Sequence, residues 1–385
     1  MTDNNELNVF SHNKGPECFD DGSGIEPEIT ESEDKITEPF DPTLIRVETK
    51  PFSMDLLISR IRENEIDLMP DFQRKAGIWS NAAQSRLIES MLIRIPLPAF
   101  YMDASDEDNW LVVDGLQRLT AINRFVIKKE LKLSGLEFLQ NLSGMGFDEL
   151  PRNFRRRINE TQVTVYLIEK DTPHEVKFNI FKRINTGGLP LSSQEIRHAL
   201  NQGAATKMLK KLAGSDAFKK ATDYGIRDHR MAAQECVLRF MAFTLKSYKS
   251  YKTKDFDNFL NTAMTTINNM KKNDRMKLED SFVRSLNASR DIFGIYAFRK
   301  QYKKDAVRNP INKALFETWT VNLNKLDDLQ CKEVKGKKEE LVNGFIELMN
   351  SNNGFDDAIS QGTGNVAKVD LRFSEISKLI REVLS

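Results

Sequence analysis

The sequence predicts an α+β protein in which a small mixed sheet with helices is followed by an all-helical half. Trp110–Val126 begins as a β-branched apolar run and continues with apolar residues at helical spacing, which predicts a strand, a tight turn and a helix. Residues 162–168, QVTVYLI, have the composition of an interior strand. From about Met208 the apolar spacing is helical nearly to the end. We predict three regions: an arm at 1–44, an α/β domain at 45–204 and a helical domain at 205–385.

The composition is that of a globular protein without strong charge bias. The 57 Lys and Arg residues balance the 56 Asp and Glu residues among 385, so a general electrostatic affinity for nucleic acid is not expected, although a local basic groove is compatible with these numbers. The three cysteines lie far apart and indicate neither a metal site nor a disulfide framework. No run reaches the roughly 18 apolar residues of a membrane helix. We expect a soluble, cytoplasmic protein without a membrane partner.

Residues 1–44 are rich in Asp, Glu, Asn, Gly, Ser and Pro, with few apolar positions. A segment that can bury little apolar surface does not offset the entropy lost on ordering. We therefore predict a disordered acidic arm that is solvated. The alternative is a mimic of nucleic acid that occupies a basic groove.

The α/β domain is expected to begin with a short strand near 46–50, followed by a helix capped by Ser53. A second strand at 66–69 leads into Pro70, and Ser80 caps the next helix. Residues 95–102 run into a strand that forms a hairpin with the strand at 110–113. The turn after that hairpin therefore lies at one end of the sheet.

Three later stretches carry further predictions. Residues 128–133, KKELKL, read as a short strand, and residues 332–338, KEVKGKK, as a charged linker between helices. A helix opened by Thr172 and Pro173 ends at Asn185, before two glycines, and Ser192 or Ser193 with Glu195 caps the helix that follows.

A basic cluster, Arg155, Arg156 and Arg157, lies within the helical stretch 147–159. Arginines grouped on one helix contact DNA phosphates in many nucleic-acid-binding proteins. The structural alternative is a solvated helix face. DNA binding through these three residues is therefore one of two interpretations.

The turn Asp114–Arg118, called the DGLQR turn below, carries the main candidate site. Unpaired N–H groups and the positive dipole end of a helix attract anions, and Gly115 would let a phosphate approach the backbone. Arg118 would add a permanently charged fork, and Asp114 could hold a divalent metal or orient a water. The alternative is that Asp114 caps the helix and Arg118 makes a surface ion pair.

DGLQRLTAI resembles the DGQQRLT motif of the DUF262 family, the GmrSD-type defence proteins with a ParB-like (sulfiredoxin-like) domain. Two further stretches resemble family segments in the same order: PDFQRKAGIW from Pro70 and FKRINTGGLPLSSQEIR from Phe181. Three ordered motifs are more specific than any one of them. Leu116 departs from the motif, because the family usually has Gln there. Similar stretches continue through the helical half.

The resemblance implies a ParB-like domain at 45–204 and a nucleotide-binding, NTP-hydrolysing component of a bacterial anti-phage, restriction-type system that acts on or senses DNA. By this resemblance, Asp114, Gln117 and Arg118 would be catalytic, with Mg²⁺ bound by Asp114. The residues expected to bind nucleotide phosphates are Gln73, Arg74, Gly115, Arg183 and Asn185. We further predict that Arg74, Arg118 and Arg183 converge on one anion site.

Two other function classes stay open. One is a DNA-binding or sensor module that binds nucleotide without turnover and relies on a partner nuclease, which Leu116 favours. The other is a metal-dependent nuclease that uses the ParB-like pocket. Many relatives carry an HNH nuclease domain, whereas no histidine follows His229 in this chain, so we expect that domain to be absent. The oligomeric state stays open, and a homo-oligomer is compatible with the sequence.

Overall fold

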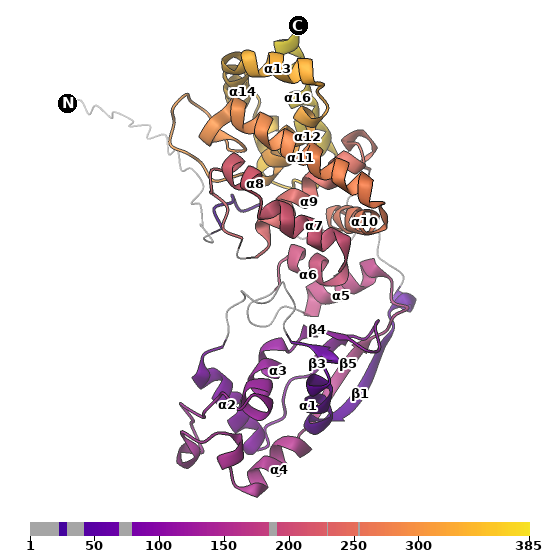
Figure 1. The fold of residues 1–385 in the computed structure, drawn as a ribbon, viewed down its shortest axis with the longest axis vertical. Helices are drawn as coiled ribbons and strands as arrows, with labels where there is room; N and C mark the ends of the chain where they lie inside the picture. The colour runs from indigo at the N-terminus through magenta and orange to yellow at the C-terminus, as the bar shows by residue number, and fades with distance from the viewer. Residues whose placement is uncertain (1–22, 29–41, 69–78, 185–190, 229, 253–254) are drawn as a thin grey trace, which may run out of the picture.

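A computed structural model describes residues 23–28, 42–68, 79–184, 191–228, 230–252 and 255–385. The α+β prediction is confirmed: a five-stranded mixed sheet with helices is followed by a helical region (Figure 1). No helix in these ranges is long and apolar enough to cross a membrane.

The sheet has the strand order β1-β5-β3-β4-β2. β1 pairs antiparallel with β5, and β3 with β4, whereas β3–β5 and β2–β4 are parallel pairs. The predicted hairpin is therefore β3–β4, and QVTVYLI is an interior strand. The strands are β1 (Val47–Ser53), β2 (Ile66–Asp67), β3 (Phe100–Asp103), β4 (Trp110–Asp114) and β5 (Gln162–Ile168).

One face of the sheet is covered by helices that share a core with it. Phe100 and Val165 from the sheet pack with Leu57, Ile88 and Leu119 from the helices. The predicted caps are present, because Ser53 and Ser80 accept hydrogen bonds from backbone N–H groups in the first turns of α1 and α2. These helices are α1 (Met54–Arg62), α2 (Asn81–Leu92), α3 (Leu116–Ile122), which continues as a π-helical turn at Asn123–Ile127, and α4 (Arg152–Glu160).

The opposite face is covered only in part. α5 (His174–Ile184) and α6 (Ser193–Leu200) pack Phe178, Phe181 and Ile196 against Val113 and Ile168 at one end of the strands. The predicted capping box of Ser192 and Glu195 starts α6. In Figure 1, α5 and α6 lie between the sheet and the helical region.

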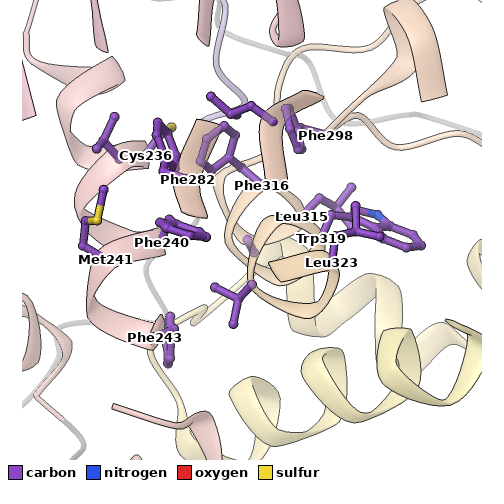
Figure 2. Packing of buried hydrophobic residues seen from close by; sticks show 14 of the residues in the cluster. Cys236, Phe240, Met241, Phe243, Phe282, Phe298, Leu315, Phe316, Trp319 and Leu323 are labelled. Atoms are coloured by element: carbon purple, nitrogen blue, oxygen red, sulfur yellow. The ribbon is translucent and has the colours of Figure 1, made fainter. Parts of the chain in front are cut away.

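The helical region has a large core of aromatic and aliphatic side chains. Phe240 and Phe282 lie 4.9 Å apart between ring centroids, Phe298 and Phe316 lie 4.5 Å apart, and Trp319 belongs to the same core (Figure 2). Its helices are α7 (Ala204–Ala213), α8 (Asp216–Ala221), α9 (Ala232–Leu245), α10 (Phe256–Asn269), α11 (Lys272–Phe293), α12 (Lys313–Asn324), α13 (Asp328–Gly336), α14 (Lys338–Ser351), α15 (Asn353–Ser360) and α16 (Val366–Leu384).

Two local predictions were wrong. Residues 128–133 form no strand, because Leu131 and Leu133 are buried in the α/β core and Leu133 pairs with the turn at Met145 and Gly144. Residues 332–336 of the expected linker lie in α13, where Val334 is buried and holds the helix on the core.

The solvated arm predicted for residues 1–44 does not hold for residues 23–28. Ile25 is buried in the helical core, and its backbone forms a bridge with Ile311. Glu28 forms an ion pair with Arg239 on α9. The sequence of residues 1–44 does not indicate this contact, because the oppositely charged and apolar residues that surround Ile25 and Glu28 are far away in the chain.

Candidate functional site

The DGLQR turn joins β4 to α3 as predicted, and Gly115 has the left-handed backbone angle φ +103°. A side chain on Gly115 would clash with the ring of Phe100, since a Cβ atom would lie 2.9 Å from Cε1 of that ring. The space that the missing side chain leaves is thus occupied by Phe100. Gly115 is required here for the turn and for packing.

Arg118 is directed into the domain and is only 8% exposed. Its Nη1 donates to the carbonyl oxygen of Pro98, and its Nη2 donates to that of Ala99 (3.1 Å) and to Oδ2 of Asp114 (2.7 Å). The guanidinium also lies 4.5 Å from the ring centroid of Phe100. Burial lowers the pKa of Arg118, and Asp114 offsets part of that effect. Arg118 therefore fixes the carboxylate of Asp114 relative to the start of β3.

Asp114 is half-buried, and an irregularity in the pairing of β3 with β4 determines which residue it lies opposite. Val112 lies opposite Met102, but Asp114 lies opposite Tyr101, so Val113 is an extra residue on β4. A bulge of this kind re-aims the side chains beside it. Within the described chain the second carboxylate oxygen of Asp114 has no hydrogen-bond partner. The turn thus presents one restrained carboxylate with a free oxygen.

Asp114 ends a row of four side chains across the sheet. The register places Thr49 opposite Tyr166, Tyr166 opposite Tyr101, and Tyr101 opposite Asp114. The two tyrosine rings are stacked, with centroids 4.7 Å apart and planes 15° apart. Burial, Tyr166 and Asp114 all raise the pKa of Tyr101. Sequence reasoning missed this row, although both tyrosines alternate with buried strand residues and therefore face the opposite side.

Gln117 has a local contact. Its side-chain oxygen accepts a hydrogen bond from the backbone N–H of Trp79 at 3.3 Å, and the carbonyl of Trp79 accepts one from Gln84 at 2.6 Å. Gln117 therefore ties the DGLQR turn to the start of α2.

The other predicted phosphate ligands are only partly visible. Gln73, Arg74 and Asn185 lie outside the described residues. Arg183 is exposed in the last turn of α5 and has no described hydrogen bond or ion pair with Asp114 or Arg118. The predicted convergence of three arginines consequently stays a prediction.

The basic cluster on α4 is not uniform. Arg156 is exposed and lies 3.8 Å from Glu160. Arg157 donates to the carbonyl of Leu92, and Arg155 is half-buried. α4 packs on α1 and α2 at the end of the domain farthest from α5 and α6 (Figure 1). A DNA contact through all three arginines stays a prediction.

A second polar cluster escaped the sequence reasoning. Lys177 on α5 and Asp103 at the end of β3 are both buried, with Nζ 3.1 Å from Oδ1, and Ser105 hydrogen-bonds to both. The pair fixes α5 on the sheet. Nothing in the sequence indicates it, because the partners are 74 positions apart.

The chemistry available at the turn is that of a single restrained carboxylate. The described residues contain no group of three or more His, Cys, Asp or Glu side chains that could hold a metal ion. A Mg²⁺ ion needs only one or two protein carboxylates when substrate phosphates supply the other ligands. Asp114 fits that limited role.

No curated protein matches the chain. Residues 55–201 match the family described as GmrSD restriction endonuclease, N-terminal domain. This range contains the DGLQR turn and the strands β2 to β5, whereas β1 (Val47–Ser53) lies before it. Residues 55–201 of the chain therefore belong to the GmrSD N-terminal domain family.

Proposed function

We propose that this protein binds a nucleoside triphosphate at the DGLQR turn and hydrolyses it as a component of a restriction-type defence system. The family of residues 55–201 supports the restriction and defence context. The observation that carries the nucleotide assignment is Asp114, half-exposed and held by the buried Arg118. Fixed groups aimed at a reacting centre need no reorganisation during the reaction.

In this proposal, Asp114 has the central role and Arg118 is a positioning residue. The free oxygen of Asp114 would orient the attacking water or hold Mg²⁺ together with phosphate oxygens. When bound, Mg²⁺ would neutralise charge that develops on the phosphates. Arg118 would not touch the phosphates, because its Nη atoms already donate to Asp114 and two backbone carbonyls. Gln117 would keep the neighbouring Trp79 backbone in place.

Two observations favour a second candidate, a sensor that binds nucleotide without turnover. Hydrolysis needs cationic groups at the phosphates. Arg118 already donates its hydrogen bonds to Asp114 and to two backbone carbonyls. Leu116 stands where the family motif usually has a glutamine. Such a protein would respond to nucleotide while a partner acts on DNA.

The experiment measures phosphate release from ATP, GTP, CTP and UTP by the full chain with Mg²⁺, and nucleotide binding by calorimetry. We expect release by the wild type and at least a 100-fold loss in Asp114→Asn. The matched control is Asp108→Asn, which changes an exposed carboxylate in the same hairpin.

The outcomes separate the function classes. Binding without phosphate release identifies the sensor. Plasmid DNA is included in the assay. If the protein neither binds nucleotide nor releases phosphate but nicks the plasmid, it is a nuclease and the proposal is contradicted. Equal phosphate release by wild type and Asp114→Asn removes Asp114 from the mechanism.

A further inference from the structure

We propose that the outer face of the Tyr166 ring, above Thr49, is the slot that receives the base of the bound nucleotide. This inference rests on the proposed function and adds a subsite to it. The slot lies on the sheet face that carries Asp114.

The first support is the alignment of the row. Thr49, Tyr166, Tyr101 and Asp114 occupy directly opposed positions on four neighbouring strands. Strands lie about 4.8 Å apart, so the row from Thr49 to Asp114 is about 14 Å long. An extended nucleotide with its base over Thr49 would direct its phosphates along the row toward Asp114.

The second support is the shape of the surface beside Tyr166. One ring face is stacked on Tyr101, and no other described aromatic ring lies against Tyr166. On its other side stands Thr49, directly opposite on β1, and the same sheet face continues with Pro51 on β1 and Thr164 on β5; all three are exposed. These small side chains leave room beside the ring for another planar group.

The third support is the boundary of the helix cover. Val113 and Ile168 on this sheet face are buried under α5 and α6, whereas Tyr101 and Tyr166 are only half-buried. Neither tyrosine hydroxyl makes a hydrogen bond with any residue that the structure describes. The pair therefore combines stacked rings with polar tips that are free to contact a ligand.

Stacking predicts the kind of selectivity. Every nucleobase has a flat aromatic face, so stacking alone tolerates all four bases. Because purines offer the larger surface, we expect ATP and GTP to bind more tightly than CTP and UTP. Exclusive recognition of one base would require hydrogen bonds to its edge in addition to the stack.

The test compares ATP with inorganic tripolyphosphate, which has the phosphates but no base. Calorimetry on the full chain with Mg²⁺ gives the dissociation constant of each. Tyr166→Ala should weaken ATP binding about ten-fold, within the range found when stacking residues are truncated, and leave tripolyphosphate binding unchanged. Tyr166→Phe should restore ATP affinity relative to Tyr166→Ala. Tyr224→Ala, which removes a tyrosine that is 67% exposed, is the matched control.

A second variant keeps the test decisive if Tyr166→Ala fails to fold. Thr49→Phe fills the slot on an exposed strand position, where an aromatic residue favours β structure. It should weaken ATP binding and spare tripolyphosphate.

Three results overturn the inference. If ATP affinity is the same in wild type, Tyr166→Ala and Thr49→Phe while tripolyphosphate binds, the slot is wrong and the phosphate site stands. If neither ATP nor tripolyphosphate binds, the proposed function is wrong, and the inferred base slot is rejected with it. If single-stranded DNA binds through Tyr166 and ATP does not, the platform serves a polynucleotide instead.

Discussion

Glu28 and Arg239 form a two-pronged ion pair across 211 positions of sequence, with Oε1–Nη1 and Oε2–Nη2 distances of 2.7 and 2.6 Å. Nη2 of Arg239 also lies 2.7 Å from Oε1 of Glu235, and Nζ of Lys313 lies 3.0 Å from Oε2 of Glu235. Such forks are the strongest hydrogen-bonded ion pairs in proteins. The segment 23–28 is therefore fastened to the helical region by charge as well as by Ile25.

Glu28→Ala is expected to destabilise the protein. Arg239 would stay buried with one carboxylate fewer. Removing one partner of a fully buried pair costs about 3 kcal/mol or more, and because 24% of the Glu28 side chain is exposed we expect a smaller loss, about 2 kcal/mol. The free energy of unfolding in urea measures the loss. Glu382→Ala, in an exposed pair with Lys378, should change it by less than about 0.5 kcal/mol. Equal losses of unfolding free energy in Glu28→Ala and Glu382→Ala would show that the ion pair between Glu28 and Arg239 adds no stability.

The ion pair between Glu28 and Arg239 also predicts that stability depends on pH. Burial alone would raise the pKa of Glu28, but Arg239 and Lys313 outweigh it and lower the pKa from 4.5 to about 2. A carboxyl with a lowered folded-state pKa stabilises the fold fully above its unfolded value and loses that contribution as the pH falls toward the folded value. The difference in unfolding free energy between wild type and Glu28→Gln should be constant above about pH 5.5 and shrink below pH 4.5. A difference that grows on acidification would contradict this assignment.

Arg118→Ala should lower stability even without nucleotide. It leaves the carbonyls of Pro98 and Ala99 and the carboxylate of Asp114 without their donor. Hydrogen bonds to a charged group contribute about 1.5–3 kcal/mol each, so we expect a loss of at least about 2 kcal/mol. Arg118→Lys should recover little, because one amine cannot reproduce the fork. Arg156→Ala, at an exposed arginine of α4, serves as the control, and a similar loss there would refute the positioning role.

Gly115→Ala and Gly144→Ala separate backbone strain from steric conflict. Both glycines have positive φ, +103° and +85°, but only Gly115 faces a ring, whereas nothing lies within 4 Å of a Cβ at Gly144. Gly144→Ala should cost about 1 kcal/mol from the left-handed backbone alone. Gly115→Ala should cost a further 1–3 kcal/mol, roughly, from overpacking against Phe100. Thermal or urea unfolding of both variants checks the difference, and equal losses would mean that Phe100 moves aside freely.

Lys177 and Asp103 allow a double-substitution test at the join between α5 and the sheet. Lys177→Met leaves a buried carboxylate unpaired and should cost about 3 kcal/mol. Adding Asp103→Leu should recover most of that loss, because an apolar pair of similar size replaces the ions. The matched single change is Lys132→Met, in an exposed pair with Glu149 at 3.9 Å. Additive losses in the double variant would show that the two charges do not interact.

Local patterns in the sequence were sufficient for several elements. The change from β-branched residues to helical spacing at Trp110–Val126 located β4, the turn and α3, and serine caps located the starts of α1, α2 and α6. These signals work because period, capping and glycine conformation depend on residues within a few positions. The same reasoning failed at residues 128–133 and 332–336, where contacts with the core determine the conformation.

The sequence by itself determined the fold class and placed a carboxylate, Asp114, at a strand-to-helix turn. Only the tertiary structure decided what surrounds it: Arg118 turns inward to backbone carbonyls, Phe100 fills the space beside Gly115, and Tyr101 and Tyr166 line up with Asp114. The docking of Glu28 on Arg239 was equally hidden. Strand register and the pairing of distant charges depend on contacts between segments far apart in the chain, so no local pattern encodes them.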